Sequence, residues 1–239
     1  FRDTEVEGGP LSSKIRVGLI FGGRSGEHEV SLASAASIFN ALDKSKYDVV
    51  LIGIDKTGRW LLPEDNLLLA HQANPMKVQL GSIEGSVSLV PYSSSSQIVP
   101  STPGLGLPSL QKLDVILPIL HGTYGEDGTI QGLLELANIP FVGSGVLGSS
   151  VGMDKDIARR LLRGAGIPVV PTMVLRKADF ARNSKKLVAE VLEKFSLPFF
   201  VKPANAGSSV GVHKIKSADQ LPAALEDAFS FDLKVLAQT

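Results

Sequence analysis

Cysteine, net charge and long apolar runs are all missing from this chain of 239 residues. Without cysteine there is no disulfide scaffold, no thiolate zinc site and no cysteine nucleophile, which suits a reducing compartment. The 24 basic and 24 acidic residues balance, so no net field favours nucleic acid or an anionic membrane surface. No apolar run approaches the ~20 residues of a membrane-spanning helix. Because 44% of the residues are hydrophobic, we expect a globular chain with a sizeable core that binds neither nucleic acid nor membrane.

Two common nucleotide-binding motifs are also absent. There is no G-x-x-x-x-G-K-[ST] sequence, so an ATP site in this chain is not a P-loop. The glycine turn at Gly22–Gly26 lacks the G-x-G-x-x-G spacing of dinucleotide-binding folds. Asp55 also lies further on than the acid expected about 20 residues later. An NAD-dependent dehydrogenase, the alternative, predicts a nicotinamide-induced fluorescence change at Trp60, which we do not expect. No His or acidic cluster has the spacing of metal ligands.

The first half of the chain alternates apolar strand patterns with helical patterns. Strand, glycine turn, helix and strand in this order predict a right-handed βαβ unit and hence a parallel sheet. A stretch rich in Ser, Pro and Gly at 92–108 is predicted to be a long surface loop. The predicted elements are strands at 14–21, 47–54, 113–120 and 139–142, and helices at 30–42 and 129–138.

The second half differs, because its helices alternate with antiparallel pairs of strands. Apolar runs at 197–201 and 210–215 flank a short glycine-containing loop, which predicts a β-hairpin. The other predicted elements are helices at 149–164, 184–195 and 218–228, an extended segment at 168–175 and a final strand from 233. We therefore predict an α/β fold in which a parallel-sheet domain precedes an α+β domain.

The loop of the predicted hairpin has the composition of an anion-binding site. Residues 204–209 are small, and Lys202 stands at the mouth of the loop. Small residues let backbone N–H groups approach an anion closely, and such concave backbone segments bind phosphate. One interpretation is a flap over nucleotide phosphates. The other is an ordinary exposed hairpin whose lysine has no role.

Two further candidates follow predicted strands of the first half. Glu27 lies in the turn after the first strand, and His121 lies in the glycine-rich turn after the strand at 113–120. Ligands of open α/β sheets sit outside the carboxyl ends of the strands, so the two side chains are predicted to face one crevice. A carboxylate held there would take a substrate ammonium, or else only interact with the helix dipole. The alternative for His121 is a structural role, and Glu126 and Asp127 are predicted to cap the next helix.

Lys155 is the second lysine of interest. It lies in the first half of the predicted helix at 149–164. Lys155 and Lys202 would flank a triphosphate as point charges. The alternative is that Lys155 is a solvated surface residue.

Five motifs occur in the same order as in a known family. They are Gly22-Gly-x-Ser-x-Glu-x-Glu-Val-Ser-Leu32, Leu120-His-Gly-x-x-Gly-Glu-Asp-Gly-Thr-Ile-Gln-Gly132, Phe141-Val-Gly-Ser-Gly145, Met153-Asp-Lys155 and Val201-Lys-Pro-x-x-x-Gly-Ser-Ser-Val-Gly211. From about Lys14 to about Leu236 the chain closely resembles the D-alanine–D-alanine ligases, which are ATP-grasp enzymes. The resemblance implies a Rossmann-like pre-ATP-grasp, substrate-binding domain at 14–146. It also implies the first α+β subdomain of an ATP-grasp fold at 147–239, and a disordered lead-in at 1–13.

The family reaction joins two D-alanines for peptidoglycan precursor synthesis. ATP phosphorylates the first carboxylate, and the second amino group attacks the acyl phosphate. The resemblance implies that Glu27 binds the ammonium of the first D-alanine and that His121 lies near its carboxylate. It also implies that Ser208 bonds Glu27 and helps to orient the second substrate.

The resemblance also assigns the nucleotide-binding residues. Lys155 and Lys202 resemble the lysines on the ATP phosphates, and Gly207, Ser208 and Ser209 resemble the flap that covers them. Fixed cations and amides suit this chemistry, because phosphorylation concentrates negative charge. A closed flap excludes water that would hydrolyse the intermediate.

The chain departs from the family in its last third, which supplies the magnesium ligands. Gln238-Thr239 stand where the family has Glu-Lys. We therefore expect a fragment without Mg²⁺ ligands of its own that is inactive alone. The alternative is a non-catalytic truncated product that acts as a binding module. The family also implies a homodimer and a cytoplasmic location, or an organelle stroma if a transit segment precedes Phe1.

Overall fold

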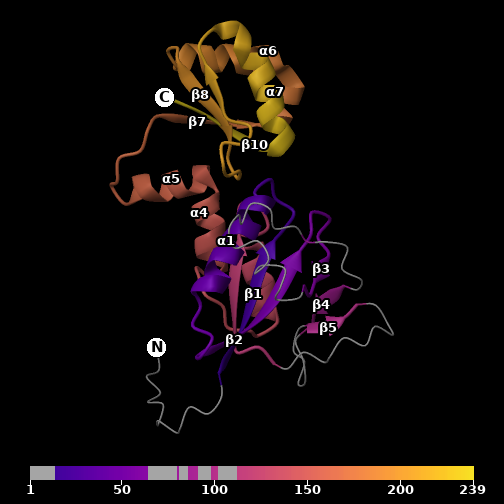
Figure 1. Cartoon of the computed structure of the whole chain (residues 1–239). Coiled ribbons are helices and arrows are strands. Elements are labelled where there is room, and N and C mark those ends of the chain that lie inside the picture. The colour runs from indigo at the N-terminus through magenta and orange to yellow at the C-terminus, as the bar shows by residue number, and fades with distance from the viewer. Residues whose placement is uncertain (1–13, 64–79, 81–85, 91–97, 102–111) are drawn as a thin grey trace. The chain divides into compact units, whose positions relative to one another are not determined.

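The computed structural model describes residues 14–63, 80, 86–90, 98–101 and 112–239 (Figure 1). Its contacts divide the chain into two compact units. Unit 1 comprises Phe1–Gly22, Glu29–Ile119 and Leu134–Gly143, and unit 2 comprises Gly23–His28, Leu120–Leu133 and Ser144–Thr239. The prediction of a lead-in at 1–13 falls outside the described residues.

Unit 1 is built on a six-stranded sheet with the order β5-β4-β3-β2-β1-β6. β1 (Ile15–Gly22) and β2 (Tyr47–Ile54) are parallel, and α1 (His28–Ala41) connects them in the chain. This confirms the predicted βαβ unit. The strands beyond β2 are antiparallel, and β6 lies beside β1. These strands are β3 (Trp60–Leu61), β4 (Val87–Leu89), β5 (Ile98–Pro100) and β6 (Val115–Leu120).

The end of β1 is buried on both of its faces. Leu19 and Phe21 pack in one apolar cluster with residues of α1, and Ile20, which points the other way, is equally buried. A strand buried on both faces loses the alternation of polar and apolar residues. The glycine at position 18 of β1 is explained by close packing, because a Cβ there would lie 2.6 Å from Cδ1 of Ile116. A larger residue at 18 would therefore have to displace the end of the Ile116 side chain, which packs over Gly18.

Two predictions for the first half need correction. The predicted loop at 92–108 contains a strand, β5, because Ile98 and Val99 pair with Leu89 and Ser88 of β4. Most of the rest of that loop lies outside the described residues. The predicted strand at 139–142 is only an isolated parallel bridge between Phe141 and Ile116. The predicted helix at 129–138 is observed as α3 (Thr129–Leu136).

Unit 2 contains a four-stranded antiparallel sheet with the order β7-β10-β8-β9. Its strands are β7 (Thr172–Arg176), β8 (Phe199–Pro203), β9 (His213–Ile215) and β10 (Lys234–Gln238). β8 and β9 form the predicted hairpin, and the last strand of the chain, β10, lies in the middle of the sheet. This antiparallel arrangement confirms the prediction of an α+β second half.

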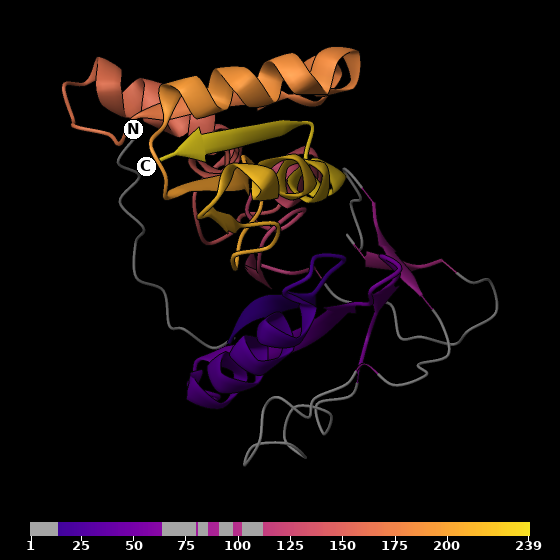
Figure 2. The ribbon, with the colours of Figure 1, turned by 90° about the horizontal axis from the view of Figure 1, so that it is seen from above.

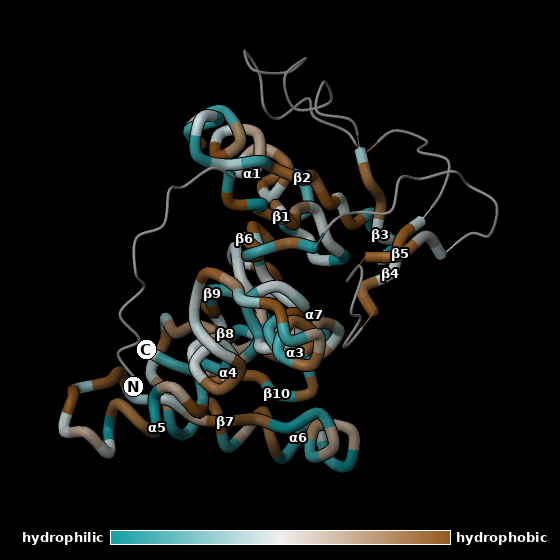
Figure 3. The backbone as a smooth tube through the Cα atoms, turned by 90° about the horizontal axis from the view of Figure 1, so that it is seen from below, coloured by the Kyte–Doolittle hydropathy of each residue, from teal (hydrophilic) through white to brown (hydrophobic). Residues whose placement is uncertain are grey.

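One face of this sheet carries the apolar core of unit 2. Leu175, Val201 and Val235 belong to one buried cluster with residues of α6 (Lys177–Lys194) and α7 (Leu221–Phe231). Figure 2 shows the orange helix α6 running alongside the yellow strand β10. Apolar residues, brown in Figure 3, concentrate on the strands, whereas α6 alternates polar and apolar segments. Among the described helices, none is long and apolar enough to cross a membrane.

The predicted helix at 149–164 is wrong in one respect, because it is two helices. α4 (Val146–Met153) ends where Asp154 adopts extended backbone angles, and α5 (Lys155–Gly164) begins at the next residue. The Asp154 side chain accepts hydrogen bonds from the backbone N–H groups of Asp156 and Ile157, so it is the N-cap of α5. This break places Lys155 at the first position of a helix rather than in the middle of one.

α6 begins seven residues before the predicted start at 184, since its first residue is Lys177. Asn183 interrupts it with non-helical backbone angles. The Asn183 side chain accepts a hydrogen bond of 3.0 Å from the backbone N–H of Lys186, as a cap would. The sequence pattern therefore detected only the second segment, whose apolar residues face the core.

Candidate functional site

Two glycine-rich turns of unit 2 come together around Ser25. Its hydroxyl donates to the backbone carbonyl of His121 over 2.6 Å and accepts a hydrogen bond of 3.2 Å from the backbone N–H of Glu27. The guanidinium of Arg24 lies 4.9 Å from the centre of the Tyr124 ring, which joins the same two turns. The turn that carries Glu27 is thus held against the turn that carries His121.

The Glu27 carboxylate lies against two glycines and one hydroxyl. A Cβ on Gly122 would lie 2.5 Å from Oε2 of Glu27, and a Cβ on Gly207 would lie 2.6 Å from the same atom. Ser208 donates its hydroxyl hydrogen bond to the other carboxylate oxygen, Oε1. A Cβ at 122 or 207 would therefore displace the Glu27 carboxylate from this position, and Gly122 also has a positive φ of 71° that favours glycine. We call Glu27, Gly122, Gly207 and Ser208 the Glu27 pocket.

The loop between β8 and β9 has a backbone shape that its residues do not favour by themselves. Ser208 and Ser209 have positive φ angles of 43° and 61°. Non-glycine residues adopt this left-handed conformation at a cost, and they do so mainly where surrounding contacts determine it. Hydrogen bonds from Val210 N to Gly207 O and from Val212 N to Ser209 O close two turns within the loop.

Contacts outside the loop also hold it in this shape. The Lys155 ammonium donates to the carbonyls of Ala206, at 2.6 Å, and Ala204, at 3.3 Å. Asn205 donates both its backbone N–H and its side-chain amide to Asp232, at 2.7 and 3.0 Å. The strand after the loop was predicted to begin at 210, but β9 begins only at 213. The loop is therefore longer than the sequence predicted, and it is fixed at both its base and its tip.

Three cations gather beside this loop. Burial lowers the pKa of Lys155, and the charge of Arg159 lowers it further. Burial also lowers the pKa of Lys202, again followed by the charge of Arg159 and then by that of Lys155. Burial lowers the pKa of Arg159 as well. Because each lysine is affected by Arg159, the three side chains form one cationic cluster. We call Lys155, Lys202 and Arg159 the cation cluster.

Most of the site residues predicted from the sequence fall into these two groups. Glu27, Gly207 and Ser208 form one pocket, with the backbone of His121 in the adjoining turn. Lys155 and Lys202 belong to the cation cluster, where their charges repel each other. Ser209 belongs to neither group, but its carbonyl accepts a hydrogen bond from Val212 N that closes a turn of the loop. Asp127 accepts a hydrogen bond of 3.0 Å from the backbone N–H of Thr129, the first residue of α3, as a cap would.

Sequence reasoning missed Arg159, Asp232 and Lys234. Arg159 was detectable, because it lies four residues after Lys155 and so on the same face of a helix. Asp232 and Lys234 carried no signal, since their partners Asn205 and Asp154 are 27 and 80 residues away in the chain.

The two groups differ in the ligands they suit. A fixed carboxylate between glycines suits a small cation such as a primary ammonium, and partly buried cations suit an anion of several charges. Within the described part of the chain, no group of three or more His, Asp or Glu side chains is placed to hold a metal ion.

Two family models match the chain. The model described as D-ala D-ala ligase N-terminus matches residues 16–144, and the model described as D-ala D-ala ligase C-terminus matches residues 161–239. Among curated relatives, a D-alanine–D-alanine ligase from Oceanobacillus iheyensis is 47% identical over 225 residues, and D-alanine–D-alanine ligase A from Escherichia coli is 48% identical over 225 residues. Each comparison covers 94% of this chain but 60% of the relative. The chain thus spans about 60% of the length of these relatives.

Solved structures give the same result. A D-alanine–D-alanine ligase from Coxiella burnetii matches with a TM-score of 0.76 and 33% identity over 95% of this chain and 61% of that one. A D-Ala:D-Ser ligase from Enterococcus faecalis matches with a TM-score of 0.77 and 33% identity over 95% of this chain and 62% of that one. The first family model alone covers more than half of the residues, and the curated relatives are nearly half identical across almost the whole chain. The chain therefore belongs to the D-alanine–D-alanine ligase family.

Proposed function

We propose that this chain supplies the first D-alanine site and part of the phosphate site of an enzyme that joins two D-alanines with ATP. The observation that carries the proposal is the Glu27 carboxylate, held between Gly122 and Gly207 and hydrogen-bonded to Ser208. A primary ammonium is the group that such a carboxylate recognises. Glu27 therefore binds the amino group of D-alanine, and His121, in the adjoining turn, lies near the substrate carboxylate.

Ser208 has a positioning role in this proposal. Its hydroxyl orients Glu27, and its backbone belongs to the loop that covers the phosphates together with Gly207 and Ser209. A second substrate that approaches Glu27 meets the same serine. Because Ser208 sits in a left-handed conformation that the loop contacts impose, its hydroxyl is already directed at Glu27 before any ligand binds.

The cation cluster fits the triphosphate of ATP. Lys155, Lys202 and Arg159 are partly buried, and they repel one another. An anion of several charges would reverse that repulsion, because each ammonium or guanidinium would gain a partner. ATP supplies the phosphoryl group that makes the first carboxylate reactive. The described residues do not provide a magnesium site, and we place the Mg²⁺ ligands in the part of the relatives' length that this chain does not span.

The remaining predictions from the resemblance stay proposals. They are the domain limits 14–146 and 147–239, a homodimer, a cytoplasmic location and a role in peptidoglycan precursor synthesis. We further propose that the 239-residue chain binds D-alanine but does not release ADP by itself. The support for this last point is that the chain spans 60% of its curated relatives.

Binding of D-alanine to the chain, measured by NMR titration, tests the proposal. We expect saturable binding that Glu27→Gln weakens by roughly thirtyfold, since loss of one partner of a desolvated charge pair costs ~2 kcal/mol or more. Glutamine keeps an oxygen for the Ser208 hydroxyl, so the pocket retains its hydrogen bond. D-lactate, which has a hydroxyl in place of the ammonium, should bind weakly to both proteins.

Glu29→Gln is the matched control. Glu29 lies two residues away, and its carboxylate pairs with Lys56 at 2.5 Å. This variant should bind D-alanine like the wild type. Equal D-alanine binding by wild type and Glu27→Gln would remove the proposed role of Glu27. In a coupled assay with ATP, Mg²⁺ and D-alanine, ADP release by the wild-type chain would contradict the proposed inactivity while supporting the ligase chemistry.

A further inference from the structure

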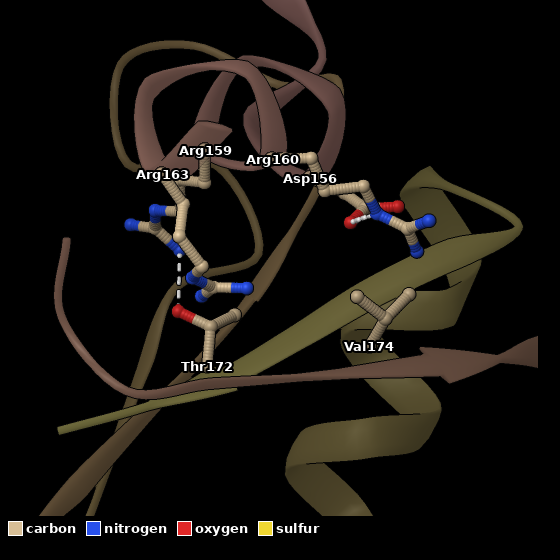
Figure 4. Close-up of a pocket in the computed structure, with 6 residues that line it drawn as sticks. All are labelled: Asp156, Arg159, Arg160, Arg163, Thr172 and Val174. Atoms are coloured by element: carbon tan, nitrogen blue, oxygen red, sulfur yellow. Dashed lines mark hydrogen bonds and ion pairs between the residues drawn. The ribbon is translucent and has the colours of Figure 1, made fainter. Parts of the chain in front are cut away.

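An arginine-lined pocket lies between α5 and β7 in unit 2. Its volume is about 320 Å³, and it is lined by Asp156, Arg159, Arg160, Arg163, Thr172 and Val174. Figure 4 shows Arg159 and Arg163 on one side of the pocket and Arg160 with Asp156 on the other. Arg159 and Arg163 are four residues apart on α5, so their guanidinium groups extend from the same helix face.

The charges of the pocket do not balance. Its one carboxylate, Asp156, is buried and already has two partners, Arg160 at 2.7 Å and Lys234 at 3.4 Å. Arg159 donates to the Thr172 hydroxyl over 3.2 Å. Among the residues that the structure describes, neither Arg159 nor Arg163 forms an ion pair with a carboxylate. Two guanidinium groups thus face the pocket without an anion between them.

Arg159 is partly buried, so part of its solvation is lost without a carboxylate partner in the described chain. Burial lowers the pKa of Arg159, because desolvation disfavours the charged form, yet a guanidinium stays charged in a protein. Natural proteins usually place a carboxylate beside a desolvated charge. At Arg159 the described neighbour is a neutral hydroxyl, so the place of the counter-charge is left for a ligand.

The pocket shares a sheet face with Lys202. Val174 of β7 is opposite Leu236 of β10, and Leu236 is opposite Lys202 of β8. Directly opposed residues point to the same face of a sheet, and two strand spacings separate Val174 from Lys202 by roughly 10 Å. The pocket therefore lies next to the cation cluster on the same face of the sheet, and Arg159 belongs to both.

We propose that Arg159 and Arg163 form a binding site for a phosphate-bearing anion, outside the Glu27 pocket and beyond the lysine pair. Paired guanidinium groups offer parallel N–H donors that match phosphate oxygens. The Thr172 hydroxyl donates to the Val170 carbonyl over 3.0 Å and accepts from Arg159, so it orients the Arg159 guanidinium. The phosphate belongs either to the polyphosphate tail of a nucleotide or to a free inorganic anion. The site itself does not depend on the proposed D-alanine chemistry.

Inorganic pyrophosphate, titrated into the chain by calorimetry, tests this site. We expect binding that the double variant Arg159→Gln, Arg163→Gln weakens by at least about tenfold, because charge-assisted hydrogen bonds are lost. The matched control is Arg182→Gln, Lys185→Gln, which removes two exposed charges from α6 and should change the affinity less than about twofold. Circular dichroism and thermal unfolding confirm that both variants are folded.

The lysine pair also loses a neighbouring cation when Arg159 is removed, so Arg163→Gln alone separates the pocket from the lysine pair. Arg163 lines the pocket but is not among the groups that shift the pKa of either lysine. We expect Arg163→Gln to weaken pyrophosphate binding, and an unchanged affinity in this variant overturns the proposal. Pyrophosphate binding that the double variant leaves at wild-type strength overturns the proposal.

A nucleotide competition separates the two sources of phosphate. If the pocket takes the phosphates of a nucleotide, a non-hydrolysable ATP analogue displaces pyrophosphate from the wild-type chain, and the double variant binds the analogue more weakly as well. An analogue that does not displace pyrophosphate assigns the pocket to a free phosphate-bearing anion. D-alanine binding by Glu27→Gln is measured separately, so failure of the proposed ligase role and failure of this site give different results.

Discussion

Two sets of charges lie around α5, and they are arranged in opposite ways. Lys234 is closely paired, with the carboxylates of Asp154 and Asp156 at 2.5 and 3.4 Å. Lys202 forms no ion pair among the described residues, and its main neighbours in charge are the cations Arg159 and Lys155. The first set attaches the break between α4 and α5 to the strand β10. The second set has no ion pair among the described residues, and the mutual repulsion of its cations raises the electrostatic energy of the folded chain.

The presence or absence of a carboxylate partner distinguishes charges that stabilise the fold from charges that are available to bind a ligand. A charge that stabilises a fold is matched by a partner from the chain itself. A charge that binds a ligand must lack that partner until the ligand arrives. Its unfavourable position is kept only because other contacts of the folded chain determine it. Lys155 stands between the two sets, since it donates to the loop carbonyls of Ala204 and Ala206 and is also repelled by Arg159.

The largest effect on stability is expected from Lys234→Met. Methionine is similar in length to lysine but leaves Asp154 without its ammonium, and the Lys234 and Asp154 side chains are only 16% and 18% exposed. Removing one member of a buried ion pair costs about 3 kcal/mol. Chemical denaturation should show this loss of unfolding free energy.

Lys185→Met is the control for that variant, because Lys185 is an exposed lysine on α6. Its effect should stay within ~0.5 kcal/mol. The loss in Lys234→Met should also depend on pH. The hydrogen bond from Lys234 and the backbone N–H groups of Ile157 and Asp156 outweigh burial and lower the pKa of Asp154. Its stabilising contribution is therefore present above the ordinary carboxyl pKa and is lost as the pH falls through the lowered one. A loss as large for Lys185→Met would contradict the assignment.

Lys202→Met should have a much smaller effect on stability. Lys202 forms no ion pair with a carboxylate among the described residues, so its replacement leaves no carboxylate unpaired. The replacement also removes the repulsion between Lys202 and Arg159. We expect the free energy of unfolding to stay within ~0.5 kcal/mol of the wild type, with no loss comparable to that of Lys234→Met. The same denaturation experiment measures both variants side by side. A destabilisation of Lys202→Met equal to that of Lys234→Met would erase the distinction between the two sets of charges.

The sequence predicted the elements better than it predicted the partners. The βαβ unit and the hairpin follow from apolar periodicity and glycine turns, both of which are local signals. The break at Asp154 was missed because α4 and α5 together match one helical pattern, and the N-cap role of an Asp in the middle of that pattern is ambiguous without the structure. The position of β10 between β7 and β8 depends on contacts across the sheet, which the sequence does not show.

The candidate site divides in the same manner. Glu27, Lys202 and Ser208 stand in or beside turns whose composition marks them, whereas Lys155 was singled out within a predicted helix. The contact between Glu27 and Ser208 joins residues 181 positions apart, and no local pattern predicts it. Arg159 was missed because an arginine on a helix is ordinarily a solvated residue. Arg160 lines the same pocket but is paired with Asp156, whereas Arg159 is hydrogen-bonded to the neutral Thr172 hydroxyl.

The smallest expected effect is on proton binding rather than on stability or affinity. Arg159→Gln should raise the pKa of both Lys155 and Lys202, because its charge is the second cause, after burial, of their lowered values. Arg160→Gln is the matched control, since Arg160 is paired with Asp156 and does not shift either lysine. NMR titration of isotope-labelled lysine side chains measures the pKa of Lys155 and of Lys202 directly in the wild type and in both variants.

The sign of the accompanying stability change follows from the same shifts. A lysine whose pKa is lowered in the folded state binds fewer protons there than in the unfolded chain, between the lowered value and the ordinary 10.5. The free energy of unfolding of the wild type should therefore rise with pH across that window, and Arg159→Gln should flatten the rise. Lysine pKa values that respond equally to Arg159→Gln and Arg160→Gln would mean that Arg159 is not part of the cation cluster. The cations around α5 would then be ordinary solvated surface charges. The contrast between the paired Lys234 and the unpaired cation cluster would be lost.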